Sequence, residues 1–285
     1  MNIAKKTLAI ASISVASIIS SQAALIFYEG VNSETDVFDQ REFAPVNARW
    51  TTSDSSFYSV SGTGQTYPGL PTQPGGFNAP NQFGRQTTAL IGQQPASGVY
   101  WLSFLVRFNA TVSTGTGVSF FQGSQERNFF GVNRVPTTPP APVGPIRWSN
   151  SIDPLSPGSP DGQFYGSNAI TPPSVGSSRF VVVRMDMSNP LGNGKGVYHM
   201  WVNPALTNGV DTAQVANGDA INGAAGTEFT PFNFDRVRIG NFDAGVPRFD
   251  EIRVATTWAS VIPEPSSALL SIMGLAAAVG IRRRK

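Results

Sequence analysis

The chain has 285 residues, of which 13% are charged, with 29 glycines, 22 prolines, no cysteine and one histidine, His199. The lack of cysteine excludes disulfides and a structural zinc site, and a single histidine excludes a multi-histidine metal centre. Six of the 20 basic residues but only one of the 18 acidic residues, Glu264, lie in the two end segments, so the body carries a net charge of about −3. The pI of about 9.0 therefore gives no support to nucleic-acid binding.

Residues 1–23 have the pattern of a secretory signal peptide. Lys5 and Lys6 form a positive start, residues 7–19 are mostly apolar, and Ser21-Gln22-Ala23 is a small-x-small cleavage site before Ala24. An uncleaved N-terminal anchor is the alternative, but the small residues at the exit favour cleavage between Ala23 and Ala24. We therefore expect export and a mature ectodomain over about residues 24–260.

The first half of this ectodomain is rich in apolar strand signals separated by polar segments. Leu25–Tyr28 predicts a strand, a short aromatic strand is expected near Phe57-Tyr58, and the Gly-, Pro- and Gln-rich residues 62–80 predict a long surface loop. The best strand is residues 98–108, GVYWLSFLVRF. Because both of its alternating sets of side chains are nearly all apolar, we predict a central strand covered on both faces.

A meander is predicted next, with strands at residues 118–121 and 127–132. Residues 135–160 contain eight prolines and predict a loop or a series of edge segments, with a short strand at Ile146–Trp148. A domain linker is the alternative for this stretch, and we favour an insertion within one domain.

The second half has a clearer alternation. In residues 178–187 the set Val181, Val183, Met185 and Met187 predicts the apolar face of a strand. Turn-forming residues 189–194 lead to a partner strand at 197–203, so a hairpin is expected. Residues 207–226 predict a loop, and residues 235–242 and 249–258 predict a closing strand pair.

The last 25 residues have three parts in a fixed order. Pro263-Glu264-Pro265 comes first, an uncharged and mostly apolar run follows over residues 266–281, and the chain ends in a basic cluster. The run is about 24 Å long as a helix, short for a bilayer, but it spans with some thinning if Val261 and Ile262 are added. A terminal amphipathic or buried helix is the less favoured alternative, because the run has no polar face. The basic residues that orient the span, tail in the cytoplasm, are Arg282, Arg283, Arg284 and Lys285.

This tail resembles the PEP-CTERM sorting signal of Gram-negative bacteria. The resemblance implies that an exosortase recognises Pro263, Glu264 and Pro265, and that the protein is held transiently in the inner membrane. It further implies processing near the triplet and delivery to the cell surface or extracellular matrix. From the residues alone, an anchor with an extended segment outside it is expected, because the prolines forbid a regular helix there.

A second resemblance covers about 80 residues of the C-terminal half. The ordered segments VVVRMDM, YHMWVNP, RVRIGNF and FDEIRVATTWASV are similar to concanavalin A-like (laminin G-like) jelly-roll domains. The implied fold is all-β: a two-sheet antiparallel jelly-roll sandwich, flanked by the signal peptide and the single C-terminal membrane helix.

Catalysis is not expected in this domain. Glycosidases need two carboxyls on the same side, whereas the adjacent Asp250 and Glu251 are predicted to point to opposite faces of a strand. We instead expect one of them to form an ion pair with Arg236, Arg238 or Arg253 across the sheet. His199 is expected to be a surface or sheet residue. A serine nucleophile is not supported, because no G-x-S-x-G pattern accompanies the single histidine.

No cofactor is expected, although carboxylates and carbonyls would suffice for calcium, with candidate ligands near Asp235, Asn241, Asp243 and Asp250. Core packing is the expected role of the aromatic residues that are also candidates for stacking on sugars: Trp50, Trp148, Phe164 and Tyr165.

These patterns predict an exported, surface-sorted, non-enzymatic protein that binds exopolysaccharide and no nucleic acid. A carbohydrate-active enzyme, either a glycoside hydrolase or a lyase on the same sandwich, is the alternative.

Overall fold

The computed structural model describes residues 25–29, 50–52, 59–61, 64–70, 76–78, 85–109, 115–134, 146–152, 164–166, 175–204, 206, 219–220, 226–241 and 247–262. The predicted signal peptide and the predicted membrane helix with its basic cluster lie outside these residues. Within them, no helix is both long and apolar enough to cross a membrane.

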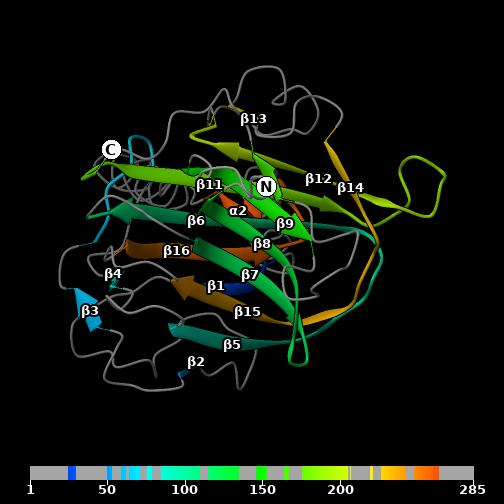
Figure 1. The fold of residues 1–285 in the computed structure, drawn as a ribbon, viewed down its shortest axis with the longest axis horizontal. Coiled ribbons are helices and arrows are strands. Elements are labelled where there is room, and N and C mark those ends of the chain that lie inside the picture. Colours follow the sequence, from blue (N-terminus) through cyan, green and yellow to red (C-terminus); the bar gives the residue numbers. More distant parts are fainter. Residues whose placement is uncertain are drawn as a thin grey trace, which may run out of the picture.

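The described residues form two antiparallel β-sheets that face each other across a common core (Figure 1). Sheet A runs β13-β12-β11-β6-β16-β4-β3, with β1 also paired to β16 and β14 to β12. Its strands are β1 Leu25–Glu29, β3 Ser59–Ser61, β4 Gly76–Asn78, β6 Val99–Phe108, β11 Ser178–Asp186, β12 Gly196–Val202, β13 Asp219–Ala220, β14 Thr227–Phe229 and β16 Pro247–Ala255.

Sheet B runs β10-β9-β8-β7-β15-β5-β2 and forms the second layer. Its strands are β2 Trp50–Thr52, β5 Arg85–Gln94, β7 Thr116–Gln122, β8 Gln125–Arg134, β9 Ile146–Ile152, β10 Phe164–Gly166 and β15 Phe234–Asn241. The predicted all-β fold with two antiparallel sheets is therefore confirmed.

The main core lies between the sheets and follows the strand alternation. In β6 the residues Tyr100, Leu102, Phe104, Val106 and Phe108 all face it, and all are buried. Sheet B contributes residues such as Phe120, Phe130 and Trp148, so the aromatic content of the chain is concentrated in this layer. Burying such large side chains provides the principal stabilisation of a domain without disulfides.

A second, smaller core covers the outer face of sheet A. Leu105 of β6 and Val182 of β11 lie in it, together with Trp258 and Val261 of the short helix α2 (Trp258–Val261) and Leu70 from the segment 64–70. The central strands β6, β11 and β12 of sheet A are therefore buried on both faces. The prediction that β6 is a central strand covered on both faces is confirmed.

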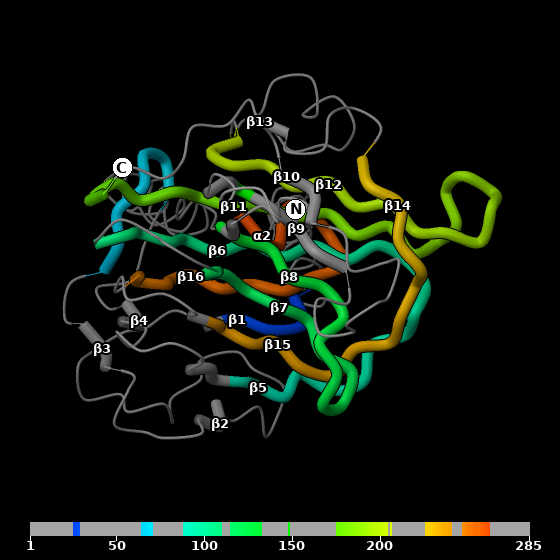
Figure 2. The backbone as a smooth tube through the Cα atoms, in the orientation of Figure 1, coloured from blue at the N-terminus to red at the C-terminus, as the bar shows by residue number. Residues whose placement is uncertain are grey.

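The first and last strands of the sandwich are neighbours. β1 pairs with β16 over Leu25–Glu29 and Ile252–Ala255, and Figure 2 shows the blue and orange ends of the tube side by side. Since β16 leads directly into α2, the two ends of the domain meet on sheet A.

Several predicted elements are confirmed in place. The hairpin is β11–β12, with Val181 opposite Val202 and Asp186 opposite Val197. The strands predicted at 118–121 and 127–132 are β7 and β8, which pair with each other, and the short strand at Ile146 extends to Ile152 as β9. The preceding strand β6 is not part of this meander, because it lies in sheet A. Residues 57–58 and most of 135–160 and 207–226 lie outside the described residues.

Three predictions are corrected by tertiary structure, and one strand was missed. The predicted closing pair does not exist, because β15 lies in sheet B and β16 in sheet A. The alternation predicted only one apolar face for β11, but Phe180 and Val182 on its other face are also buried, in the second core. Residues 62–80 are not simply a surface loop: Leu70 is buried and residues 76–78 form β4. The polar strand β5 was not predicted.

Candidate functional site

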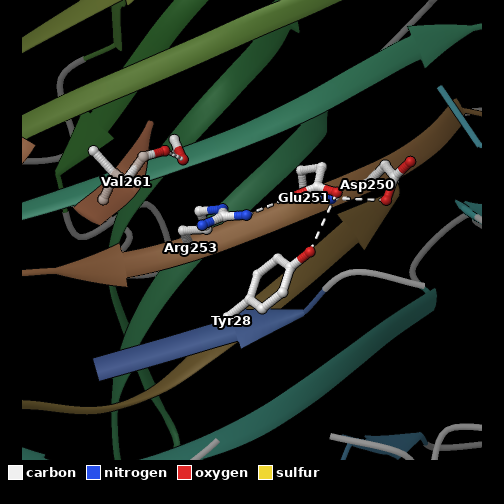
Figure 3. A network of polar contacts seen from close by, with 6 residues as sticks. Tyr28, Asp250, Glu251, Arg253 and Val261 are labelled. Atoms are coloured by element: carbon white, nitrogen blue, oxygen red, sulfur yellow. Dashed lines mark hydrogen bonds and ion pairs between the residues drawn. The ribbon is translucent and has the colours of Figure 1, made fainter. Parts of the chain in front are cut away.

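The outer face of sheet A holds a buried cluster of charged groups at a β-bulge in β16 (Figure 3). Asp250 lies opposite Leu105 and Arg253 opposite Ser103, so β16 uses one more residue than β6 over this stretch. Glu251 takes the left-handed backbone conformation, with φ of 52°. A β-bulge changes the direction in which the neighbouring side chains point. A non-glycine residue at positive φ is uncommon.

The bulge brings both carboxylates to the same face, so the prediction that Asp250 and Glu251 point to opposite faces is wrong. Glu251 contacts Arg253 of β16 and Tyr28 of β1, and Asp250 contacts Gln65 in the segment that covers this face. The alternation rule fails here because it assumes a regular strand, and the extra residue cancels one alternation.

Glu251 is 1% exposed and accepts two hydrogen bonds from side chains. The Tyr28 hydroxyl donates to its Oε1 at 3.3 Å, and Arg253 donates to its Oε2 at 3.0 Å. The Arg253 guanidinium also lies 4.1 Å from the centre of the Tyr28 ring. Burial, together with the Glu251 charge, raises the pKa of Tyr28 well above its usual range. The expected ion pair to Arg253 is confirmed, although it lies along one strand and not across the sheet.

Asp250 is fully buried and ties β16 to the segment 64–70. Its oxygens accept hydrogen bonds from the backbone N–H of Gln65 at 3.1 Å and of Glu251 at 2.9 Å. Gln65 in turn donates to the carbonyl of Arg248 at 2.9 Å. Because both carboxylates of this cluster are removed from solvent and hydrogen-bonded, neither can reach a polymer substrate.

Sheet B carries a second buried ion pair on its outer face, between Arg238 of β15 and Glu126 of β8. Each side chain is 3% exposed, Ser119 of β7 donates to the same carboxylate, and the Arg238 guanidinium lies 4.4 Å from the centre of the Phe121 ring. The partner of Arg238 is thus Glu126, and Arg236 pairs with Asp235.

Three glycines lie in one row across this face. Gly131 of β8 is opposite Gly117 of β7, which is opposite Gly240 of β15. A Cβ at Gly117 would lie 2.2 Å from the carbonyl oxygen of Phe130, and a Cβ at Gly131 would lie 2.2 Å from that of Thr116. Glycine is therefore required where β7 and β8 approach so closely.

Among the side chains that the structure describes, an accessible part of the outer face of sheet B lies on β5 and β15. Leu90 is 44% exposed, and the side chain of Arg236 directly opposite it is 37% exposed. Thr88 next to them is half-buried. We call Thr88, Leu90 and Arg236 the open patch. It combines hydroxyl, apolar and guanidinium groups, which suit contacts with a hydroxylated polymer.

The other predicted site residues are placed singly. His199 of β12 is a buried sheet residue that stacks on Trp201, with ring centres 5.6 Å apart, as expected. Trp148 is fully buried in the main core, which confirms packing as its role. The side chains of Trp50, Phe164 and Tyr165 lie outside the described residues.

The calcium candidates are not brought together by the described structure. Asp235 is on sheet B and accepts a hydrogen bond from the Gly123 N–H, whereas Asp250 is on sheet A. Asp243 and the side chain of Asn241 lie outside the described residues. No cluster of three or more His, Cys, Asp or Glu residues suited to a metal ion occurs in the described part of the chain.

Sequence reasoning missed Glu126 and Tyr28 as members of these clusters. Glu126 and Arg238 are 112 residues apart, and Tyr28 and Glu251 are 223 apart. No local pattern marks such pairs. Glu126 itself lies among the polar residues Gln125, Arg127 and Asn128, so its burial could not be read from the sequence.

Comparison with known proteins identifies the tail. Residues 261–285 match the PEP-CTERM protein-sorting motif, which confirms the resemblance drawn from Pro-Glu-Pro, the apolar run and the basic cluster. The chain therefore carries a sorting signal for export. No curated protein matches the chain.

Among solved structures the chain is similar to several β-rich domains at low identity. The globular domain of T. cruzi calreticulin is 14% identical, over 83% of this chain and 90% of that one, with a TM-score of 0.49. Alginate lyase Aly36B is 11% identical over 81% and 98%, with a TM-score of 0.46. The Ca²⁺/Man-bound VIP36 exoplasmic/lumenal domain is 10% identical over 71% and 84%, with a TM-score of 0.40.

Proposed function

We propose that this chain is an exported, surface-sorted β-sandwich protein that binds exopolysaccharide without turning it over. The observation that carries the proposal is the PEP-CTERM match over residues 261–285, directly at the end of the packed sandwich. In this scheme an exosortase recognises Pro263-Glu264-Pro265 while the apolar run holds the protein in the inner membrane. Processing then releases the sandwich to the cell surface or matrix.

The charge distribution supports this order of events. The basic residues that end the chain, Arg282, Arg283, Arg284 and Lys285, orient a membrane segment with its tail in the cytoplasm, which leaves the sandwich outside. The apolar run of residues 266–281 is short for a permanent span, so it suits a hold that ends with processing.

The carboxylates of the described sandwich support the non-enzymatic part. Four carboxylates are buried, and each accepts a hydrogen bond from another residue: Glu126, Asp186, Asp250 and Glu251. Acid–base cleavage of a glycosidic bond needs two carboxyls that both face the substrate. Among the described residues these four are committed to the fold.

For the polymer, we propose the open patch of Thr88, Leu90 and Arg236 as a contact surface. A guanidinium donates several hydrogen bonds in a plane, and an exposed leucine beside it offers an apolar surface to a sugar ring. The outer face of sheet B continues from this patch toward the buried Arg238–Glu126 pair, which fixes the backbone of β15 beneath it.

The sorting part is tested in the producing bacterium by cell fractionation of full-length variants. We expect Glu264→Gln, or deletion of residues 282–285, to leave unprocessed protein in the inner membrane. Glu228→Gln, which removes an exposed carboxylate from β14, is the control and should be delivered normally. Normal delivery of the tail variants would contradict the sorting proposal.

The binding part is tested with the released surface form on a glycan array, together with a polysaccharide hydrolysis and lyase screen. We expect binding without turnover, and a weaker signal for Arg236→Ala than for the control Lys195→Ala, which changes a cation on the turn between β11 and β12. Turnover of any polysaccharide would favour the carbohydrate-active enzyme. No binding and no turnover would leave a purely structural role at the surface.

A further inference from the structure

We infer that the processing bond lies C-terminal to Ile262, because residues 258–262 belong to the folded sandwich and not to an exposed linker. This inference rests on the proposed sorting function, which it deepens by setting the upstream limit of cleavage. The matched motif begins at Val261, so its first two residues are also the last two packed residues of the domain.

The packing of this segment is extensive for five residues. Val261 is fully buried, Ile262 is 8% exposed and Trp258 is 9% exposed. The Trp258 ring lies edge-on to Trp101 of β6, with ring centres 5.2 Å apart. These side chains complete the second core over the outer face of sheet A, together with Leu105 and Phe180.

Hydrogen bonds fix the backbone at the same place. The Ser103 hydroxyl, fully buried on β6, donates to the carbonyl oxygen of Val261 at 2.5 Å (Figure 3). The Ile262 N–H donates to the carbonyl oxygen of Trp258 at 3.2 Å. The Val261 carbonyl is thus held by the central strand of sheet A, and Pro263 follows Ile262 directly in the sequence.

Peptide-bond cleavage requires the substrate backbone to leave its folded contacts and enter an active site. Cleavage of folded chains therefore follows the population of locally opened states. Opening residues 258–262 would expose Trp258, Val261 and Ile262 together and would leave the buried Ser103 hydroxyl without its acceptor. A bond beyond Ile262 requires none of this. The sandwich consequently protects every bond up to Ile262, and Pro263-Glu264-Pro265 follows directly in the sequence.

The test is the C-terminal residue of the processed form, determined by intact mass and C-terminal peptide analysis of protein from the producing cell. We expect a single C-terminus at Ile262 or beyond, with Val261 and Ile262 retained. A processed form that ends at Val261 or earlier would overturn the inference while leaving the sorting function intact. A surface form that still ends at Lys285 would instead contradict processing itself, and with it the proposed function.

A loosened variant tests the cause independently of the sorting enzyme. Ser103→Ala combined with Val261→Ala removes the backbone hydrogen bond and part of the apolar anchor, and Gln122→Ala, at an exposed position of β7 in sheet B, is the control. Detergent-purified full-length protein is treated with an elastase-type protease, which cuts after small apolar residues. We expect the loosened variant to be cut after Ala259 at least tenfold faster than the parent and the control. Equal cutting after Ala259 in the parent and in the loosened variant would overturn protection by the fold.

Discussion

At the scale of single residues, three carboxylates of the described sandwich are paired inside it. Glu251, Glu126 and Asp186 are each buried, and each contacts an arginine: Arg253, Arg238 and Arg184. Burial of a carboxylate is unfavourable unless such partners compensate it. Loss of one partner is therefore expected to destabilise the fold. One substitution tests this towards alkaline pH, and another tests it towards acid pH.

Tyr28→Phe removes the hydroxyl that donates to Glu251, a charged acceptor, at 3.3 Å. We expect a loss of about 1 kcal/mol at pH 7, or a fall in Tm of about 2–4 °C. Because the pKa of Tyr28 is raised above its ordinary value of 10.0, its hydroxyl stabilises the fold below pH 10 and this contribution is lost as the pH rises further. Melting curves of wild type and variant should thus converge at alkaline pH. Tyr100→Phe is the comparison variant, because it removes a hydrogen bond to an uncharged acceptor, the carbonyl oxygen of Pro95. An unchanged Tm at pH 7 would contradict the prediction.

Asp186→Asn tests the acid side. Burial alone raises the pKa of Asp186, but hydrogen bonds from Ser188 and the nearby Arg184 guanidinium outweigh it and hold the pKa below the ordinary 3.8. The ionised form therefore stabilises the fold above the unfolded pKa, and this contribution is lost as the pH falls through the folded pKa. We expect the variant to be about 1–2 kcal/mol less stable at pH 7, with the difference shrinking below about pH 4. Denaturant unfolding of wild type and variant, at pH 7 and below about pH 4, measures this difference in stability.

The control for this prediction is Asp235→Asn, since the Asp235–Arg236 pair is more exposed, at 25% and 37%, and is expected to contribute less. A difference between wild type and Asp186→Asn that stays constant from pH 7 to pH 3 would show that the carboxylate charge is not the cause.

At the scale of elements, the strands depend on local departures from regular geometry. The bulge in β16 places Asp250 and Glu251 on one face, where they connect to Gln65 and to Tyr28. On sheet B the close approach of β7 and β8 requires glycine at both Gly117 and Gly131. Both features position polar or charged groups without interrupting the sheets.

Gly117→Ala tests the close approach. The added Cβ would lie 2.2 Å from the carbonyl oxygen of Phe130 and 2.9 Å from the Cα of Gly131, so β7 and β8 must move apart. We expect a loss of about 2–3 kcal/mol, by the same strain that overpacking causes. Gln122→Ala, at the exposed end of β7, is the control and should change stability by less than about 0.5 kcal/mol. Thermal and urea unfolding of both variants decide it, and similar stabilities would refute the steric argument.

At the scale of the whole molecule, the two end segments and the sandwich have opposite charge. Lys5, Lys6 and the basic cluster of residues 282–285 hold six of the 20 basic residues, and the body keeps 14 basic against 17 acidic residues. The high pI thus belongs to the targeting segments, and the body itself is weakly acidic.

Isoelectric focusing tests this separation. The precursor should focus near its pI of about 9.0, and the released form, with a net charge of about −3, should focus below pH 7. Retention of Glu264 after processing would lower the value further. A released form that still focuses in the basic range would show that both the signal peptide and the basic cluster had been kept, because either one alone brings the net charge no higher than about zero.

The sequence by itself determined the features that depend on nearest neighbours and on overall pattern. Alternation marked β6, β11 and β12, turn residues marked the hairpin between β11 and β12, and the ordered tail marked the sorting motif over residues 261–285. Each of these is encoded within about 25 consecutive residues, because strand pleat, turn geometry and membrane affinity are local properties of the chain.

Only the tertiary structure decided which strands are partners and which charges meet. β15 and β16 follow one another in sequence yet lie in different sheets, and Glu126 meets Arg238 across 112 residues. The central strands of sheet A are buried on both faces because α2 and the segment 64–70 fold over them, and one extra residue in β16 reverses the expected direction of Glu251. These outcomes depend on which distant apolar surfaces cover one another, and that free energy is a property of the assembled sandwich, which no single stretch of sequence contains.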